Sequence, residues 1–326
     1  MPTIFLFNVE PLEVRQFLDA TAALDAHGVF RVTGTDAGEA ISVALNGDGT
    51  QVEATVDGSV VGSADLSSVK FVYVNALAGD DTVTIDASLA DVRSAISGGD
   101  GNDTLTTSSN NTNVSGGSGD DTIVVNGTGR NRVTGGDGND SITTGNGSDR
   151  IDAGAGNDTV TAGNGNDFVS GNDGNDSISL GSGKDQVQGG SGDDVITGGL
   201  AGVGTLYVYG GDGNDVITSN AAESHLFGDA GDDTITGSDG NDTIYGGDGT
   251  DSLSGGSAGT DSVNDGSPDT GDLGDGLGGR HRGHGRGHGG GDCAGQDNSS
   301  TDPSSSTVVS ARAGLAVNAF SNRRIR

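Results

Sequence analysis

The sequence predicts an all-β solenoid, a fold in which short strands stack coil upon coil along one axis. Three observations point to this class. A nine-residue unit recurs through the middle of the chain, Gly supplies 63 of the 326 residues, and no proline occurs from Leu12 to Ser267. Self-similarity at a fixed period is the signature of repeat architectures, and a long ladder of paired backbone amides tolerates no proline in its strands.

The composition argues against an ordinary globular core. The chain has no Trp, one Met and 4% aromatic residues, beside a formal net charge of -32, whereas aromatic side chains carry much of the buried area of most cores. Nucleic acid and anionic lipid are excluded as partners because both are bound through clustered Lys and Arg. We therefore expect cations as partners. The single Cys293 excludes a disulfide framework and a Cys-rich zinc site.

No membrane span is predicted, because no stretch approaches the roughly 18 apolar residues that cross a bilayer. The first residues, MPTIFLFNVEP, lack the basic start and long apolar run of a secretory signal peptide. The sequence therefore shows no signal for the general export route.

The repeat is clearest from Gly135 to Thr197, where seven units follow one another without insertion. They read GGDGNDSIT, TGNGSDRID, AGAGNDTVT, AGNGNDFVS, GNDGNDSIS, LGSGKDQVQ and GGSGDDVIT. Further units begin at Gly98 and Gly116, and a second block begins at Gly210. In thirteen good copies, position 4 is Gly, position 6 is Asp and position 8 is Leu, Ile or Val. A flexible acidic linker has no reason to keep these three positions in register.

Each position of the unit has a physical reading. Gly at positions 2 and 4 permits positive φ and close stacking of neighbouring loops. Positions 7 to 9 form one short strand with a single inward side chain. The expected inward residues are Leu105, Ile123, Ile142, Ile151, Val160, Val169, Ile178, Val187, Ile196, Ile217, Ile235, Ile244 and Leu253. One aliphatic side chain does not offset the ordering of nine residues, at roughly 1 to 2 kcal/mol each, so stacking of the coils must supply the rest.

A GGxGxD turn presents a carboxylate and free backbone carbonyls, which are the hard oxygen ligands that calcium takes in groups of about 6 to 8. Zinc and copper favour His or Cys, and His225 in a degenerate unit is the one such residue in the repeats. An EF-hand is excluded because Glu223 is the only glutamate after Glu53, and a bidentate Glu closes that loop.

These units resemble the RTX, or hemolysin-type, calcium-binding nonapeptide GGxGxDxUx. The resemblance implies a right-handed parallel β-roll with two nonapeptides per coil and Ca²⁺ between loops of successive coils on one edge. Carried over to this chain, it implies as metal ligands Asp103, Asp121, Asp140, Asp149, Asp158, Asp167, Asp176, Asp185, Asp194, Asp215, Asp233, Asp242 and Asp251.

Pairing of successive loops predicts roughly ten Ca²⁺ ions, whose charge of about +20 nearly balances the repeat segment. Residues 98–263 contain 26 acidic and 4 basic residues. Without metal, carboxylates stacked about 4.8 Å apart repel one another. We expect the segment to be largely disordered without calcium and to fold on binding it. The affinity expected per site is weak, about 10⁻⁴ to 10⁻³ M, as in extracellular modules.

Composition divides the chain into four parts: a targeting-like segment at 1–28, a β-rich cap at 29–97, the calcium-binding β-roll at 98–263, and a low-complexity tail at 264–326. Strands are predicted in the cap at VFRVT, ISVAL, VEATV, VKFVYV and TVTI, with turns at Asn46–Gly49 and Asp57–Gly58. The cap is expected to shield the first coil, although a separate ligand-binding domain there is the alternative interpretation.

The two ends carry motifs of their own. Leu12 to Ala20 is similar to the LEPR-XLL motif found near the start of large surface or secreted proteins, with Val14 in place of its Pro and Phe17 in place of one Leu. An amphipathic helix docked on the cap is the alternative. The tail is expected to be disordered, and its RHRGHGRGH tract with His281, His284 and His288 is of a kind that binds Zn²⁺ or Ni²⁺. The basic ending SNRRIR differs from the acidic or apolar C-terminal export signals of RTX proteins.

No catalytic site is predicted. HExxH is absent, and the GxSxG match at Gly255–Gly259 lies in a worn repeat without a strand-turn-helix context. The leading interpretation is a secreted or cell-surface calcium-binding protein with a structural or adhesive role, whose partners are calcium and extracellular matrix or cell-surface components. One alternative is a hydrolase or epimerase with its site on the cap, using acids such as Asp36 and Asp57. The other is an ice-binding RTX solenoid, which the mixed residues at loop position 3 disfavour.

Overall fold

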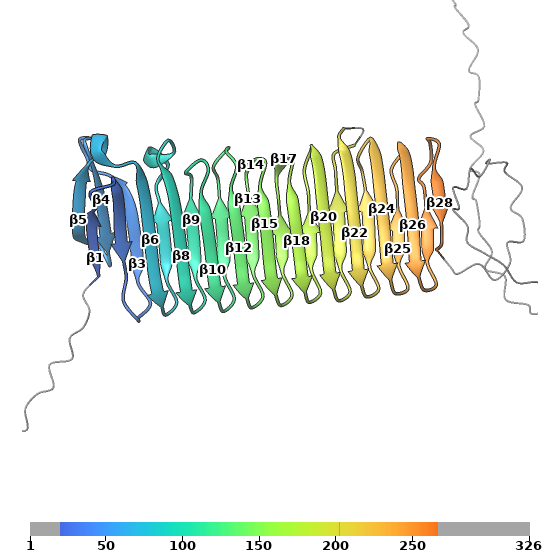
Figure 1. The fold of residues 1–326 in the computed structure, drawn as a ribbon, viewed down its shortest axis with the longest axis horizontal. Helices are drawn as coiled ribbons and strands as arrows, with labels where there is room; N and C mark the ends of the chain where they lie inside the picture. Colours follow the sequence, from blue (N-terminus) through green and yellow to red (C-terminus); the bar gives the residue numbers. More distant parts are fainter. Residues whose placement is uncertain (1–19, 202, 267–326) are drawn as a thin grey trace, which may run out of the picture. The chain divides into compact units, whose positions relative to one another are not determined.

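The computed structural model describes residues 20–201 and 203–266 (Figure 1). These residues belong to one compact unit, Met1–Asp272, and the second unit, Leu273–Arg326, lies outside the described residues. The LEPR-XLL-like motif, apart from Ala20, and the His-rich tract also lie outside them. Two 13-stranded sheets run along the described chain and face each other as the two walls of a parallel β-solenoid, which confirms the predicted all-β class.

The first wall, sheet A, takes one strand from each coil of the repeat region and adds β1 at the N-terminal end. In spatial order it contains β1 (Thr21–Leu24), β2 (Val29–Thr33), β6 (Phe71–Ala78), β8 (Arg93–Asp100), β10 (Asn113–Ser118), β12 (Arg132–Asp137), β15 (Arg150–Ala155), β18 (Phe168–Asp173), β20 (Lys184–Ser191), β22 (Thr205–Asp212), β24 (Glu223–Ala230), β26 (Asn241–Asp248) and β28 (Ser262–Asn264).

The second wall, sheet B, has shorter strands. In spatial order it contains β5 (Ser59–Asp65), β4 (Gln51–Val56), β3 (Ala40–Leu45), β7 (Thr82–Ile85), β9 (Thr104–Thr107), β11 (Thr122–Val125), β13 (Ser141–Thr144), β16 (Thr159–Thr161), β19 (Ser177–Ser179), β21 (Val195–Gly198), β23 (Val216–Ser219), β25 (Thr234–Thr236) and β27 (Ser252–Ser254). A small third sheet pairs β14 (Asn146–Gly147) with β17 (Asn164–Gly165), and two 3₁₀ turns, η1 (Leu66–Ser68) and η2 (Ala87–Leu89), complete the elements.

Two nonapeptides make one coil. Ile142 of β13 pairs with Val160 of β16, 18 residues later, and Ile151 of β15 pairs with Val169 of β18. Alternate units therefore place their strands in opposite walls. Twelve of the thirteen predicted inward aliphatic residues are buried, and the last, Leu253, packs against the core partly buried. Each coil thus adds two aliphatic side chains to one continuous core between the walls.

The N-terminal end is closed by antiparallel pairing. β3, β4 and β5 form a meander, and β1 pairs antiparallel with β2. The predicted turn at Asp57–Gly58 joins β4 to β5 with positive φ at both residues. Parallel pairing begins at β2 with β6 and at β3 with β7, so the solenoid ladder extends upstream of Gly98 into the segment expected to be the cap.

Two loop edges connect the walls. We call edge I the row of loops that run from the end of a sheet A strand to the start of the next sheet B strand, and edge II the row that returns from sheet B to sheet A. Edge I is regular and lies along the lower side of Figure 1, whereas edge II carries β14, β17 and the more varied loops of the upper side. No helix in the described residues is long and apolar enough to cross a membrane.

Candidate metal-binding edges

Edge I carries an unbroken row of aspartates at loop position 6. Each accepts a hydrogen bond through Oδ1 from the backbone N–H of the equivalent residue in the preceding coil. Nine such bonds, with N–O distances of 2.7 to 3.0 Å, connect Asp81, Asp103, Asp121, Asp140, Asp158, Asp176, Asp194, Asp215, Asp233 and Asp251. Because each carboxylate is held by a backbone donor, its second oxygen has a fixed direction.

That second oxygen has no hydrogen-bond partner. In all ten of these aspartates Oδ2 is buried and unpaired, and Asp121, for example, is 1% exposed. The two ion pairs of the described residues, Arg31–Asp25 and His225–Glu223, lie away from the row. Buried charges are normally paired or bound to a metal. The row therefore has the unmet oxygen ligands that a cation would satisfy.

The glycine at position 1 leaves open the space that faces this oxygen. A Cβ on Gly116 would lie 2.1 Å from Asp121 Oδ2 and 2.7 Å from the carbonyl oxygen of Gly135 in the next coil. The same arrangement recurs at Gly98 and Gly210. A carboxylate oxygen and a carbonyl oxygen from successive coils thus converge beside a residue without a side chain. Both lie within reach of one Ca²⁺, whose Ca–O distances are about 2.3 to 2.6 Å.

Burial raises the pKa of nine carboxyl groups of the edge I row, from Asp81 to Asp233. Desolvation is the largest cause, and the neighbouring aspartates of adjacent coils raise it further, so that the pKa of Asp121 and of Asp158 is about 7. The backbone N–H donated to each carboxylate acts in the opposite direction but is the smaller effect. Carboxyl groups whose pKa is raised toward neutrality by burial are ones that a divalent cation would bind and stabilise in the charged form.

On edge II, loop position 6 holds Asp in only some of the coils, so the row of carboxylates is interrupted. Asp149, Asp167 and Asp185 are connected by two N–H to Oδ1 bonds of 2.8 and 3.0 Å, and Asp242 donates to Asp261 at 3.1 Å. Between these groups the register places Leu206 and Ser224. Upstream of Asp149 the position holds Asn131 and Thr112, which continue the hydrogen bonding without charge.

The thirteen predicted ligands therefore divide between the edges. Nine lie on edge I, and Asp149, Asp167, Asp185 and Asp242 lie on edge II. Twelve of them, all except Asp185, keep a buried oxygen without a partner. Their role as ligands remains a prediction, and the arrangement brings them together only as neighbours along a row, never as a cluster.

Sequence reasoning missed the start of the edge I row. Asp81 lies in ALAGDD, which lacks Gly at positions 1 and 2, and its N–H bonds Asp103 while its own Oδ1 accepts from Glu39. Glu39 occupies the equivalent position in the first coil, and its carboxylate accepts hydrogen bonds from the N–H and hydroxyl of Thr35. The signal available in the sequence was ALAGDDTVT, whose last six residues follow the repeat from position 4 onward.

The side chain at loop position 5, which varies between Asn and Asp, also joins successive coils, and this role was not predicted from the sequence. The Asn or Asp side chain accepts from the backbone N–H of position 5 in the following coil, at 2.7 to 2.9 Å from Asn102 to Thr250. This direction is opposite to that of the position 6 bonds. Each gap between coils on edge I is thus closed by two side-chain bonds of opposite direction.

The donor set fits calcium and does not fit a transition metal. No group of three or more His, Cys, Asp or Glu side chains comes together within residues 20–201 and 203–266. A metal at these edges must therefore take backbone carbonyl oxygens together with carboxylates, which is the ligand chemistry of Ca²⁺. In the GxSxG match, Ser257 is exposed and its hydroxyl donates to Asp239 Oδ1 at 2.5 Å.

Comparison with known proteins identifies the family of the repeats that form these edges. The model of the RTX calcium-binding nonapeptide repeat matches residues 95–123, 125–160, 153–187, 180–200, 207–223 and 225–264. The chain belongs to this family of calcium-binding repeat proteins.

Two further comparisons add less. Among the solved structures that resemble this chain is one described as a hyperactive, Ca²⁺-dependent, β-helical antifreeze protein from an Antarctic bacterium. It is 21% identical, with a TM-score of 0.39, and the match covers 74% of this chain and 80% of that one. No curated protein matches the sequence.

Proposed function

We propose that the chain is a secreted or cell-surface protein whose solenoid becomes rigid when Ca²⁺ bridges successive coils, and that its role is structural or adhesive. The observation that carries the proposal is the row of buried, unpaired Oδ2 atoms on edge I. An uncompensated buried carboxylate costs several kcal/mol, and ten in register constitute a strong requirement for cations.

The arrangement supports a number of ions close to the predicted ten. Nine gaps separate the ten aspartates of edge I, and two more separate Asp149, Asp167 and Asp185 on edge II. One ion in each gap would supply charge of the same order as the acidic excess of the repeat segment. The break at Leu206 and Ser224 separates the edge II sites into two groups.

A calcium titration of the full chain tests the proposal. Metal-depleted protein at neutral pH is expected to give a disordered circular dichroism spectrum that becomes β-rich in millimolar Ca²⁺, with cooperative binding along the stack. Mg²⁺, which demands stricter octahedral geometry, serves as the control and is expected to leave the spectrum unchanged. A β-rich spectrum in excess chelator at neutral pH would contradict the proposal.

The secreted or surface location follows from the weakness expected of such sites. Extracellular modules bind calcium at about 10⁻⁴ to 10⁻³ M, which only extracellular calcium saturates. The role proposed is non-catalytic, since the cap acids Asp36 and Asp57 lie in exposed loops or turns. Fractionation of the source cells, with detection of the chain in the medium or on the surface, tests the location. A hydrolase screen tests the enzymatic alternative.

Ice binding is a second candidate with one observation in its favour. The outer face of sheet B carries two columns of mostly Thr and Ser without a charged side chain, as in the pairs Thr104 with Thr122 and Thr143 with Thr161. The mixed residues of loop position 3 on edge I do not form such a column. Thermal hysteresis of the calcium-loaded protein separates this candidate from the structural role.

A further inference from the structure

The outer face of sheet A differs from the rest of this acidic molecule. The described residues contain seven Lys and Arg, and none lies on a sheet B strand. Five lie on sheet A strands, and the other two, Lys70 and Arg130, lie within two residues of β6 and β12. The five are Arg31, Arg93, Arg132, Arg150 and Lys184. Positive charge is therefore gathered on one wall.

A shallow trough of about 290 Å³ lies on this face, across β6, β8, β10 and β12. Tyr73 stands at one side and Arg132 at the other. The floor between them is formed by small or polar side chains, among them Ala95, Ser97, Asn113 and Ser115. The trough thus offers an aromatic ring, hydroxyl and amide groups, and a guanidinium within one open surface.

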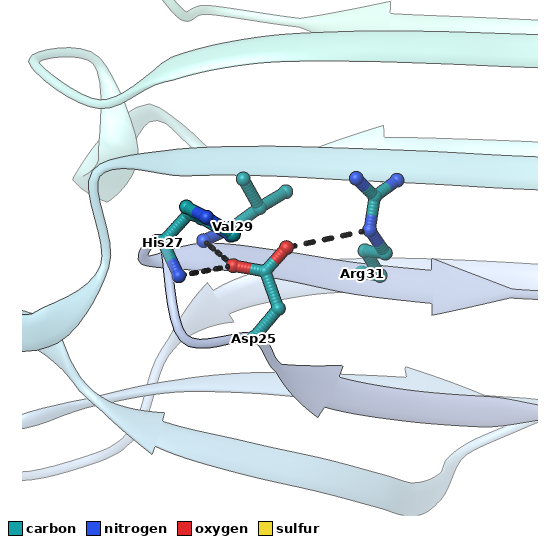
Figure 2. A network of polar contacts seen from close by, with 4 residues as sticks. All are labelled: Asp25, His27, Val29 and Arg31. Carbon is teal, nitrogen blue, oxygen red and sulfur yellow. Dashed lines mark hydrogen bonds and ion pairs between the residues drawn. The ribbon is translucent and has the colours of Figure 1, made fainter.

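Tyr73 has one ring face occupied and one free. Arg31, on β2, lies with its guanidinium carbon 5.4 Å from the Tyr73 ring centroid. Asp25 holds Arg31 through an ion pair of 3.7 Å and is itself fixed by the N–H groups of His27 and Val29 (Figure 2). On the opposite side, the register places Ala95 next to Tyr73, and its methyl group leaves the space above it open.

The same column shows what such a space accepts. Tyr207 and His225 lie in the same column, seven and eight strands along sheet A from Tyr73, and their rings stack at 4.6 Å with an angle of 8° between planes. Arg150 lies likewise over the Phe168 ring at 4.4 Å. At Ala95 the column lacks the ring or guanidinium that would stack on Tyr73. A ligand ring of similar thickness fits there.

We propose that this trough binds an acidic polysaccharide, with one sugar ring stacked on Tyr73 above Ala95 and a carboxylate or sulfate of the chain bound by Arg132. The hydroxyl and amide groups of the floor suit sugar hydroxyls, whereas a purely aromatic ligand would leave them unpaired. Arg binds planar oxyanions through paired charge-assisted hydrogen bonds. Long nucleic acid is disfavoured because it is bound through many phosphate contacts from clustered Lys and Arg, whereas the trough offers one guanidinium, that of Arg132.

The inference goes beyond calcium binding and gives the adhesive role a ligand class. Its test uses the full chain at constant free Ca²⁺ and calorimetric titration with three pentasaccharides: a galacturonate, a sulfated galactan and a neutral glucan. Comparison of the galacturonate with the sulfated galactan shows whether the trough prefers a carboxylate or a sulfate. We expect at least one acidic pentasaccharide to bind about tenfold or more tightly than the neutral one, with affinity that falls as salt rises.

Two variants address the two sides of the trough. Ala95→Tyr adds a ring that fills the space beside Tyr73, and Arg132→Gln removes the charge. Each is expected to weaken binding about tenfold or more, as the loss of a charge-assisted hydrogen bond or a stacking surface implies. Gln186→Tyr and Lys184→Gln likewise add a ring and remove a positive charge, but on β20 outside the trough, and are expected to leave affinity unchanged.

Equal affinity of Ala95→Tyr and the parent chain, equal binding of neutral and acidic sugars, or no binding of either acidic sugar at millimolar concentration would each overturn the inference. If Ala95→Tyr fails to give the calcium-loaded spectrum, Arg132→Gln decides, because its side chain is exposed. Failure of the calcium proposal is seen separately, as a spectrum independent of Ca²⁺. A calcium-dependent spectrum without sugar binding overturns this inference alone.

Discussion

The backbone N–H of Asp121 donates to Oδ1 of Asp140 at 2.8 Å, while Oδ2 of the same Asp140 carboxylate is buried without a partner. One oxygen thus joins two coils by a hydrogen bond, and the other remains available to a cation. The same division of roles along the whole of edge I gives rise to the following predictions.

Metal-depleted protein is expected to be more ordered at acidic than at neutral pH. Burial raises the folded pKa of Asp121 and Asp158 to about 7 from the ordinary value of 3.8, so the folded form binds more protons between these values. The resulting stability is fully present below about pH 4 and is lost as pH rises through 6 to 7. Circular dichroism of protein freed of metal on a chelating resin, recorded from pH 3 to 8, checks this. A flat profile would speak against a desolvated row.

Calcium is expected to reverse this dependence. Ca²⁺ requires the ionised carboxylate, so its stabilisation should increase as pH rises through the same range. Thermal unfolding in saturating Ca²⁺ should therefore show a Tm that rises from pH 5 to 7. A falling Tm over this range would show that the carboxylates do not bind the metal.

Asp158→Asn is expected to weaken calcium-dependent folding from the middle of edge I. The amide can still accept the N–H of Asp140, but the charge that faces the two neighbouring gaps is lost. We expect a higher Ca²⁺ midpoint and one or two fewer bound ions, measured by equilibrium dialysis. Asn157→Asp, at exposed position 5, changes charge in the neighbouring residue and should leave the ion count unchanged.

Asn131→Asp is expected to add an ion. Asn131 continues the edge II row above Asp149, to which it donates through its N–H at 2.9 Å, and it is buried. The substitution would place two carboxylates in adjacent coils where there is now one. An unchanged stoichiometry would indicate that the surrounding carbonyl oxygens, and not the carboxylate, limit the site.

Gly117→Ala is expected to prevent the calcium-loaded fold. Gly117 has φ of 132° and an added Cβ would lie 2.0 Å from the carbonyl oxygen of Gly99, so neither the backbone angle nor the coil spacing accepts a side chain. Gly47→Ala is the matched control, because nothing lies within 4 Å of its added Cβ. Its stability should change by no more than about 0.5 kcal/mol. Thermal unfolding of both variants in Ca²⁺ makes the comparison.

Phe227→Ala is expected to destabilise the calcium-loaded solenoid more than Tyr245→Ala. Phe227 stacks on Tyr209 at 4.9 Å and on Tyr245 at 5.4 Å, whereas Tyr245 has one such contact among the stacked pairs of the described residues. Each aromatic pair contributes about 0.5 to 1.5 kcal/mol beyond its buried area. Equal effects in chemical unfolding would show that the stack does not act as two separate contacts.

Much of the fold could be predicted because the residues within each repeat unit determine the turn and the strand of that unit. The strands at Val29–Thr33 and Thr82–Ile85 have their predicted bounds, and the position 8 side chains are inward as expected. These features depend on neighbours within one unit: a glycine permits the turn, and an aliphatic side chain is buried in the core. No long-range information was needed for them.

The division of aspartates between the edges could be inferred only in part. Edge assignment depends on how many residues each coil contains, and the insertion before Thr205 shifts Leu206 into the position that Asp185 holds one coil earlier. Glu39 escaped notice because its loop shares almost no residues with the repeat. The trough beside Tyr73 was also invisible, since its side chains are brought together by pairing across coils.

The paired bonds of positions 5 and 6 have a consequence for evolution of the molecule's size. Every internal coil presents the same two contacts to the coil before it and to the coil after it, so the duplication of any 18-residue segment creates no new kind of joint. Each duplication lengthens the solenoid by about 4.8 Å and adds a pair of loops. Gain or loss of whole coils therefore changes the length of the solenoid in fixed increments, while the N-terminal closure stays the same.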